Sequence, residues 1–343
     1  MLPDHILEWG IEVILALQGL GDWLIGPMNL LTFFGNIEFY LLVMPLIYWC
    51  WDSQLGLRVG IILLLNTGLN VLFKMVTPNS RPYWLDPRVR LLTNPEGSLG
   101  IPSGHAQNAV AVWGVIAAYL QTGWAWAVAI FLMFFIGLSR VYLGVHYPTD
   151  VFGGWLLGLM VLILFLKLEG PVAARLSQLD PPAQLAVVLA VSIGLALIGA
   201  LIGFRTDAGW DPPLEWIENS AAQAPDNPIA PFSLEILVSS AGAFLGLTAG
   251  AILLRPEIGF KAGGRWPKLV GRYILGIIGV LLLWRGLGAL FELWAEAESL
   301  AGYALRYIRY SAIGLWVSAL GPLLFIRLGL AEGQKPSTLE VRD

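Results

Sequence analysis

The chain contains three short runs in which basic or imidazole side chains stand beside turn-forming residues. In the first run, Lys74 and Arg81 lie seven residues apart, where a long apolar stretch gives way to a turn that contains proline. An arginine fork matches two oxygens of a phosphate group, and a lysine adds a compact point charge. This pair could therefore hold a phosphate, although basic side chains at a membrane surface also serve as simple anchors to lipid headgroups.

The second run is Ile101-Pro-Ser-Gly-His105, directly before an apolar stretch that predicts a helix. Ser103 is a residue type that caps helix N-termini, and Gly104 lets the backbone approach a ligand closely. Backbone amides at such a start point toward an anion and are helped by the helix dipole. We expect His105 to stand on the first turn beside any bound anion, although ordinary capping and polar packing of a histidine give the same pattern.

The third run holds Arg140, His146 and Asp150. A spacing of four residues places the imidazole and the carboxylate on one face of a helix, although Pro148 disturbs the local geometry. A carboxylate bonded to one ring nitrogen fixes the tautomer and leaves the other nitrogen as a nucleophile. A structural histidine–aspartate pair that closes a helix start is the alternative.

The composition indicates which elements must position these residues. Of 343 residues, 57% are hydrophobic and only 13% are charged, whereas about a quarter of the residues in an ordinary soluble domain are charged. This excess of apolar side chains suits a bilayer, which takes about 20 apolar residues to cross. The formal net charge of −4 gives no basic surface for nucleic acid. The single Cys50 excludes an intrachain disulfide and a cysteine-based metal cluster.

Long apolar runs predict an all-α, polytopic transmembrane helix bundle of about ten spans. The expected spans cover residues 5–20, 37–51, 57–76, 104–121, 123–143, 150–168, 183–204, 232–254, 270–291 and 303–327. Acidic residues interrupt the first span, and residues 19–35 could instead form a re-entrant or interfacial piece. Because consecutive spans cross a bilayer alternately, the three runs are all expected at the same face of the membrane.

In this order and with this spacing, the motifs K-x6-R-P, P-S-G-H and S-R-x5-H-x3-D resemble the signature of the type 2 phosphatidic acid phosphatase superfamily. That superfamily includes membrane lipid phosphatases, glucose-6-phosphatase and the soluble vanadium haloperoxidases. The resemblance covers residues 37–168 and implies a phosphatase core of six helices within residues 1–169. Residues 170–343 resemble no named family; we expect them to add about four transmembrane helices, an acidic external loop at about 204–232 and a polar tail.

The resemblance also implies a mechanism. His146 would attack phosphorus to form a phosphohistidine with Asp150 orienting its ring, and His105 would protonate the leaving oxygen and then activate water. The phosphate oxygens would be held by the side chains of Lys74, Arg81, Ser103 and Arg140 and by the amide of Gly104. No metal ion and no cofactor is required, because the cations take the electrostatic part that magnesium plays elsewhere.

An active site at a membrane surface favours an amphiphilic substrate whose tail stays in the bilayer. Phosphatidic acid, phosphatidylglycerol phosphate, undecaprenyl diphosphate and a sphingoid phosphate all fit, so the expected partners are a membrane lipid phosphate and the bilayer, and not nucleic acid. The Tyr83-Trp84 pair resembles the glucose-6-phosphatase branch, which leaves a sugar phosphate as an alternative. Two different classes of protein also fit: a transporter or scaffold that uses Arg285, and a vanadate-dependent haloperoxidase. The oligomeric state is left open.

Basic residues predict the side of the membrane on which the site lies. Eleven lysines and arginines are expected away from the active face, against five on that face once the three proposed phosphate ligands are set aside. The cluster from Arg255 to Arg272 lies in one short loop, where the positive-inside rule is strongest. We therefore predict an integral membrane protein, in the inner membrane if the source is a bacterium, whose active site faces the extracytoplasmic side.

Overall fold

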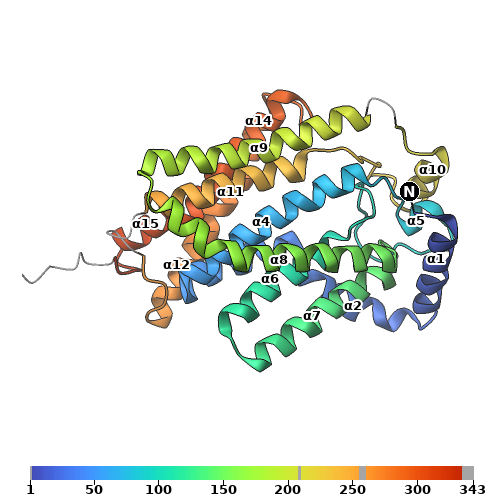
Figure 1. The fold of residues 1–343 in the computed structure, drawn as a ribbon, viewed down its shortest axis with the longest axis horizontal. Helices are drawn as coiled ribbons and strands as arrows, with labels where there is room; N and C mark the ends of the chain where they lie inside the picture. Colours follow the sequence, from blue (N-terminus) through green and yellow to red (C-terminus); the bar gives the residue numbers. More distant parts are fainter. Residues whose placement is uncertain (1, 208–209, 255–259, 334–343) are drawn as a thin grey trace, which may run out of the picture. The chain divides into compact units, whose positions relative to one another are not determined.

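The computed structural model describes residues 2–207, 210–254 and 260–333, and the regular elements in these ranges are helices (Figure 1). The chain forms two compact units that are interleaved along the sequence. Unit 1 consists of Met1–Tyr40, Leu65–Pro171 and Leu195–Leu237, and unit 2 of Leu41–Leu64, Val172–Gly194 and Val238–Asp343. The expected polar tail lies outside the described residues. The division into a phosphatase core at 1–169 and a further helical region at 170–343 stays a prediction.

Seven helices in the described ranges are long and apolar enough to cross a membrane. They are α4 (Ser53–Val76), α7 (Gly123–Tyr142), α8 (Pro148–Leu176), α9 (Pro181–Asp207), α11 (Glu235–Leu253), the run Trp266–Glu292 from α12 (Trp266–Leu281) to α13 (Leu287–Glu292), and the run Leu300–Arg327 from α14 (Leu300–Leu315) to α15 (Gly321–Arg327). The number becomes eight if α1 (Asp4–Gln18) and the segment Asp22–Phe33, which contains α2 (Ile25–Phe33), form one span broken by a 90° bend. The all-α membrane class is thus confirmed.

The difference from the ten expected spans comes from short helices. The helix α6 (Gly104–Leu120) has 17 residues, which at 1.5 Å per residue is about 26 Å, less than the roughly 30 Å of a bilayer's hydrocarbon core. The apolar helix Phe39–Trp51, which includes most of α3 (Ile37–Leu46), is shorter still. The bend between α1 and α2 falls where a re-entrant or interfacial piece is expected.

Glycines let α6 pack closely against α8. A Cβ on Gly154 would lie 2.6 Å from the carbonyl oxygen of Ser103, and a Cβ on Gly158 would lie 2.6 Å from that of Gln107. Side-chain carbon atoms do not approach a backbone this closely, so the two helix backbones can meet only where α8 carries glycine. The start of α6 is thereby held against the first turns of α8, where two of the predicted motifs meet.

Buried amide side chains tie α4 to the start of α6. Asn70 Nδ2 donates to the Pro102 carbonyl oxygen at 3.1 Å and to Gln107 Oε1 at 2.7 Å. Gln107 Nε2 in turn donates to Asn66 Oδ1 at 2.8 Å, and Asn66 Nδ2 donates to Asn108 Oδ1 at 2.6 Å. Because buried amides are costly unless they are paired, this network has one favourable arrangement. It holds the turn that precedes His105.

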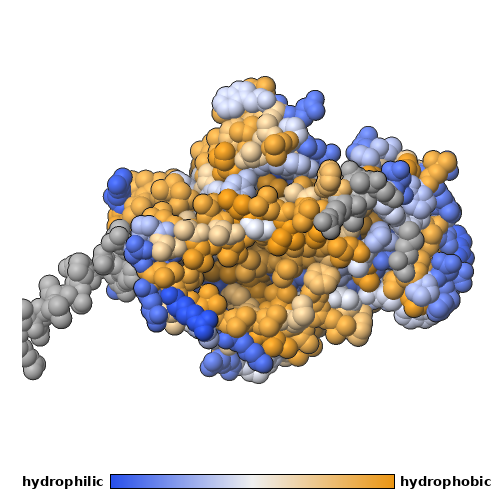
Figure 2. Space-filling view, turned by 45° about the horizontal axis from the view of Figure 1, so that its top comes forward, coloured by the Kyte–Doolittle hydropathy of each residue, from blue (hydrophilic) through white to orange (hydrophobic). Residues whose placement is uncertain are grey.

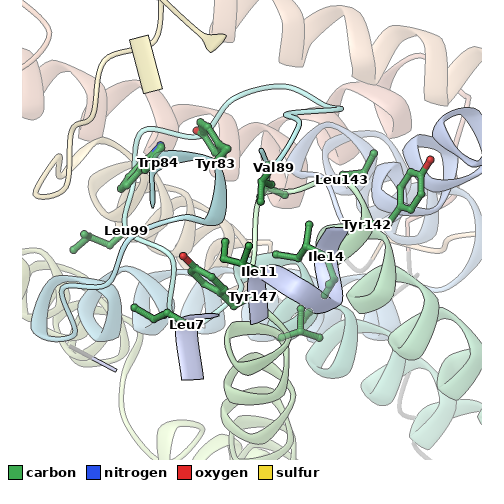
Figure 3. Packing of buried hydrophobic residues seen from close by; sticks show 14 of the residues in the cluster. Leu7, Ile11, Ile14, Tyr83, Trp84, Val89, Leu99, Tyr142, Leu143 and Tyr147 are labelled. Atoms are coloured by element: carbon green, nitrogen blue, oxygen red, sulfur yellow. The ribbon is translucent and has the colours of Figure 1, made fainter. Parts of the chain in front are cut away.

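A hydrophobic core within unit 1 anchors the loops around these helix ends (Figure 3). Side chains of α1 pack there with those of α5 (Pro82–Leu85) and of the loops at 86–99 and 143–147; the members that Figure 3 labels are Leu7, Ile11, Ile14, Tyr83, Trp84, Val89, Leu99, Tyr142, Leu143 and Tyr147. Tyr83 and Trp84 are both 0% exposed. The aromatic pair that resembles the glucose-6-phosphatase branch is therefore part of the packing of this core.

The segment expected to be an acidic external loop contains a helix, α10 (Leu214–Gln223), which lies beside α5 (Figure 1). Trp216 packs into the core of unit 1. Asn219 Nδ2 donates to the carbonyl oxygen of Trp84 at 3.0 Å, and Gln223 Nε2 donates to that of Val89 at 3.0 Å. A segment beyond residue 169 thus helps to hold the loop that follows α5.

Within its described residues, unit 2 combines close helix packing with a buried arginine. Arg272 on α12 donates to the carbonyl oxygens of Trp49 at 2.6 Å and Leu330 at 2.8 Å, so its buried guanidinium is paired with backbone groups. A Cβ on Gly246 of α11 would lie 1.9 Å from the carbonyl oxygen of Ser311 on α14, which shows how closely these helices approach. These contacts account for Arg272 and the small residues by packing.

Large apolar side chains are exposed along the spanning helices. Phe152 and Leu156 of α8 are 59% and 54% exposed, and Leu197 and Leu201 of α9 are 62% and 55% exposed. Figure 2 shows hydrophobic residues over most of the face in view, with hydrophilic residues gathered toward its edges. A surface of this kind is unfavourable in water and favourable against lipid chains, which agrees with an integral membrane protein.

Candidate active site

The structure brings the basic and imidazole residues of all three sequence runs together in unit 1. At the centre lies a residue that the sequence analysis did not select, Glu96. Arg81 Nη2 donates to Glu96 Oε2 at 2.6 Å, and Arg140 Nη2 donates to Glu96 Oε1. Two ring nitrogens stand close to the same carboxylate, His105 Nδ1 at 3.9 Å and His146 Nε2 at 4.0 Å. Four of the predicted residues therefore surround one anionic group.

His146 and Asp150 form a pair, with the ring Nδ1 of His146 at 3.2 Å from Asp150 Oδ2. Both residues are 0% exposed. The contact crosses the start of a helix and does not run along a helical face as expected, because α8 begins at Pro148 and His146 precedes it. Asp150 Oδ2 also accepts the backbone N–H of Tyr147 at 3.0 Å, which holds the carboxylate in place. The other ring nitrogen, Nε2, accepts a hydrogen bond from Arg81 Nη1 at 3.4 Å.

Arg81 is fixed by the loops around it. Its Nε donates to the carbonyl oxygen of Ser98 at 2.6 Å and its Nη1 to that of Val145 at 2.9 Å. Lys74, in the last turn of α4, reaches the same loop, since its Nζ donates to Ser98 Oγ at 3.0 Å. Ser98 Oγ also accepts from Arg81 Nη2 at 3.1 Å. Ser98 thus links the two cations of the first sequence run.

Ser103 occupies the N-cap position of α6, but its hydroxyl does not cap the helix. Within the described residues, Ser103 Oγ and Arg140 Nε are buried atoms without a hydrogen-bond partner. Gly104 opens the helix, and a Cβ there would lie 3.1 Å from Asn70 Oδ1. Donors that protein groups leave unpaired at a cluster of cations are suited to an anion with more oxygens than one carboxylate.

His105 lies on the first turn of α6, as expected, and is held from the N-terminal part of the chain. Its Nε2 is 2.8 Å from Asn36 Oδ1. Arg140 is held from the same segment, because its Nη1 donates to Thr32 Oγ1 at 2.6 Å. The side chains of His105 and Glu96 keep 20% and 25% of their surface exposed, whereas that of His146 is fully buried. The site is therefore open to solvent on the side of His105 and Glu96.

The electrostatics of the site favour an anionic Glu96 and a neutral His146. Burial acts to raise the pKa of Glu96, but the charges of Arg81 and Arg140 outweigh it, and the pKa lies well below its ordinary value. Burial lowers the pKa of His146, and the positive charge of Arg81 lowers it further. A buried neutral imidazole has a free electron pair at one nitrogen, which is the form that a nucleophile requires.

Among the residues that the structure describes, no three His, Cys, Asp or Glu side chains gather in the way that a metal site requires. The expectation that neither a metal nor a cofactor takes part stays a prediction. Glu96, Ser98, Thr32 and Asn36 are the site residues that the sequence analysis missed. A carboxylate seven residues before Ser103 has no spacing signal of its own, and the other three are common polar residue types.

Comparison with known proteins places the eight predicted site residues in one matched region. Residues 55–171 match the PAP2 superfamily, and residues 238–333 match the transmembrane extension of PAP2 superfamily phosphatases. Thr32 and Asn36 lie outside both ranges.

Three relatives illustrate the range of the similarity. Phosphatidylglycerophosphatase B of Bacillus subtilis is 37% identical over 124 residues, which are 33% of this chain and 56% of that protein. Undecaprenyl-diphosphatase of Sulfolobus acidocaldarius is 32% identical over 122 residues, 35% of this chain and 58% of that protein. Glucose-6-phosphatase 3 of Bos taurus is 27% identical over 354 residues, 94% of this chain and 95% of that protein. The first two matches thus span little more than half the length of those relatives.

Proposed function

Residues 55–171 and 238–333 belong to the PAP2 superfamily, and on this premise we propose that this integral membrane protein hydrolyses a phosphate monoester or diphosphate of a lipid. The observation that carries the proposal is the convergence of Arg81, Arg140, His105 and His146 on the carboxylate of Glu96. The two oxygens of that carboxylate use donors that a phosphate group would use. A phosphate has further oxygens for the unpaired donors of Ser103 and Arg140.

In the first half of the proposed reaction, His146 Nε2 attacks phosphorus. A bond forms between phosphorus and nitrogen, and the bond from phosphorus to the leaving oxygen breaks with its electron pair on that oxygen. His105 gives a proton to this oxygen, so that an alcohol leaves instead of an alkoxide. Asp150 keeps the His146 ring in place and stabilises the positive charge that the ring acquires.

In the second half, His105 takes a proton from water, and the hydroxide that forms attacks phosphorus. The bond between phosphorus and His146 breaks, which restores the free imidazole and releases phosphate. The negative charge on the phosphoryl oxygens is stabilised throughout by Lys74, Arg81, Ser103, Arg140 and the Gly104 amide. Their fixed positions, such as that of Arg81 between the carbonyl oxygens of Ser98 and Val145, spare the cost of reorganisation during the reaction.

A lipid substrate is supported by the apolar surface of the spanning helices, because a substrate with acyl or prenyl chains can reach a surface site through the bilayer. The named relatives include a phosphatidylglycerophosphatase and an undecaprenyl-diphosphatase. A sugar phosphate is the second candidate, because the similarity to glucose-6-phosphatase 3 extends over 95% of that protein. The positive-inside rule supports a site on the extracytoplasmic face, of the inner membrane in a bacterium.

The variant His146→Ala tests the proposal. We expect it to abolish phosphate release from every substrate, because it removes the nucleophile, and to leave the protein folded. The measurement is phosphate release in detergent from phosphatidic acid, phosphatidylglycerol phosphate, undecaprenyl diphosphate, sphingosine phosphate and glucose 6-phosphate. His5→Ala is the matched control, since His5 is an exposed histidine of α1.

An active His146→Ala protein would contradict the mechanism. A wild-type protein that releases no phosphate from any of these substrates would contradict the proposed function and favour a transporter or scaffold. Preferred turnover of glucose 6-phosphate would replace the lipid substrate by a sugar phosphate. Binding of vanadate without any phosphatase activity would point to the haloperoxidase alternative.

A further inference from the structure

The N-terminal segment between α1 and α3, which precedes the part of the chain that matches the PAP2 superfamily, touches the site at two points. Thr32 at the end of α2 accepts a hydrogen bond from Arg140 Nη1 at 2.6 Å, and Thr32 is 3% exposed. Four residues later, Asn36 Oδ1 lies 2.8 Å from His105 Nε2. Both contacts reach groups that the proposed reaction uses.

We propose that Asn36 is a positioning residue that orients the His105 ring so that its Nδ1 faces the phosphate. The inference rests on the proposed function, in which His105 is the acid and then the base. If the amide oxygen of Asn36 accepts the N–H of Nε2, the neutral ring carries its free electron pair on Nδ1. That nitrogen is the one 3.9 Å from Glu96 Oε1, on the side of the anionic group that a phosphate would replace.

The partners of the two histidines differ in charge, and the difference matches their proposed tasks. His146 is backed by the carboxylate of Asp150, which favours a positive ring and so assists the attack on phosphorus. His105 is backed by the neutral amide of Asn36, which fixes the direction of the ring and stabilises a bound proton less than a carboxylate does. As the acid, His105 is the imidazolium with a second proton on Nδ1, and a proton that its partner stabilises less is easier to give to a leaving oxygen; loss of this proton leaves the neutral ring that then acts as the base.

The backbone at Gly35 lies close enough to the His105 ring for the Asn36 side chain to reach Nε2. A Cβ on Gly35 would lie 3.1 Å from His105 Cδ2 and 3.0 Å from Ile136 Cγ2, so a larger residue would push the segment away from the ring. Gly35 is buried between α6 and α7, and the side chain of Asn36 is half-buried. Asn36 is therefore held against His105 by the packing of its neighbours.

The first experiment is independent of turnover. The chain has three histidines, so ¹⁵N-labelled imidazole signals can be assigned with His105→Gln and His146→Ala variants. In the wild type in detergent, we expect the neutral His105 ring to carry its proton on Nε2. In Asn36→Ala we expect this preference to be lost, with no change in the His146 signals. An unchanged His105 tautomer in Asn36→Ala would overturn the proposal, whatever the enzyme's activity.

The second experiment separates a positioning role from a general structural one. Because Asn36 acts on a proton transfer, Asn36→Ala should slow release of a lipid alcohol by about 10- to 100-fold. The first-turnover release of p-nitrophenol from p-nitrophenyl phosphate should change little, since that leaving group needs no proton. Inhibition by vanadate should also be unchanged, because it depends on Arg81 and Arg140. Equal losses for both substrates, or no loss for either, would overturn the proposal.

Two further variants complete the test. Asn36→Asp keeps an acceptor for Nε2, so we expect activity to return with an optimum at higher pH, because a carboxylate stabilises the protonated ring. An Asn36→Asp protein as slow as Asn36→Ala at every pH would contradict the proposal. Asn29→Ala is the matched control: Asn29 lies on α2 and donates to the carbonyl oxygens of Ile25 and Leu92, so the ratio between the two substrates should stay that of the wild type.

Discussion

At the scale of single residues, the least expected feature is that the cationic site already holds an anion from its own chain. The backbone of Glu96 is fixed, because Tyr83 Oη donates to its carbonyl oxygen at 3.0 Å. Its side chain keeps 25% of its surface exposed. In the proposed reaction, a phosphate must take over the hydrogen bonds that Arg81 and Arg140 make to this carboxylate.

The variant Glu96→Gln tests this competition. We expect tighter binding of vanadate and a lower KM, because a neutral amide competes less well than a carboxylate for two arginines. Without a bound anion, the variant should unfold at a lower temperature than the wild type, since Arg81 and Arg140 lose their counter-charge. Vanadate should raise the unfolding temperature more in the variant than in the wild type. Weaker vanadate binding by Glu96→Gln would instead make Glu96 part of the machinery that holds the phosphate.

The same variant should change the pH dependence of unfolding. The pKa of Glu96 in the folded protein lies well below its ordinary value, so its contribution to stability is present above that ordinary value and is lost as the pH falls toward the folded-state pKa. The unfolding temperature in detergent should therefore fall less steeply with pH, between about pH 6 and pH 3, in Glu96→Gln than in the wild type.

At the scale of elements, the contact between α6 and α8 decides where the motifs stand. Gly154 lies four residues after Asp150 and faces the Ser103 carbonyl oxygen, so it couples the phosphate-binding turn to the helix that carries Asp150. Its role could not be read from the sequence, since α8 has other glycines. Gly170, on the same helix, has no atom within 4 Å of the position of an added Cβ.

The variant Gly154→Ala should therefore destabilise the protein and reduce its activity. The added methyl group would meet the Ser103 carbonyl oxygen at 2.6 Å, and relief of such overpacking costs about 1–3 kcal/mol. Gly170→Ala is the matched control and should leave both properties unchanged or raise stability slightly, because alanine favours a helix. Thermal unfolding and phosphate release in detergent provide the measurements. Equal behaviour of the two variants would contradict the coupling.

At the scale of the whole molecule, the helices around the short helix α6 indicate how α6 lies in the bilayer. It packs along α7, and its first turn and the end of α7 both reach Glu96, through His105 and Arg140. The two helices therefore form a hairpin whose open ends lie at the site, and we expect α6 to cross the bilayer beside α7. Of the six α-helices described between Asn94 and Lys261, five then count as crossings, α6, α7, α8, α9 and α11, and α10 lies beside α5. An odd number of crossings predicts that these two residues are accessible from opposite sides of the membrane.

Labelling of single cysteines tests this topology together with the positive-inside rule. In a Cys50→Ala background, we expect Asn94→Cys to react with an impermeant maleimide in intact cells, because Asn94 is exposed beside the site. Lys261→Cys, also exposed, should react only after the membrane is permeabilised. Labelling of both positions from outside would contradict the odd number of crossings, and the reverse pattern would place the site on the cytoplasmic side.

Much of the fold and eight of the twelve residues of the candidate site could be predicted because their signals are local. Membrane class follows from composition, and helix positions follow from apolar runs, since each helix satisfies its own backbone in lipid. The types and spacing of five residues indicate binding of a phosphate by cations beside imidazole groups: Lys74, Arg81, His105, Arg140 and His146. Helix length is predicted less well, because the depth that α6 reaches depends on its neighbours.

Only the tertiary structure decides which group faces which. Glu96, Thr32 and Asn36 have common side chains, and they matter because folding carries them to Arg140 and His105 over as many as 108 residues of sequence. Such contacts depend on tertiary packing, as at Gly35. Tertiary packing produces no fixed residue spacing that could be recognised in the sequence. The sequence by itself therefore determines a membrane protein with basic and imidazole residues whose types and spacing suit a phosphate. The folded chain determines that an internal carboxylate occupies that site and which side of His105 faces it.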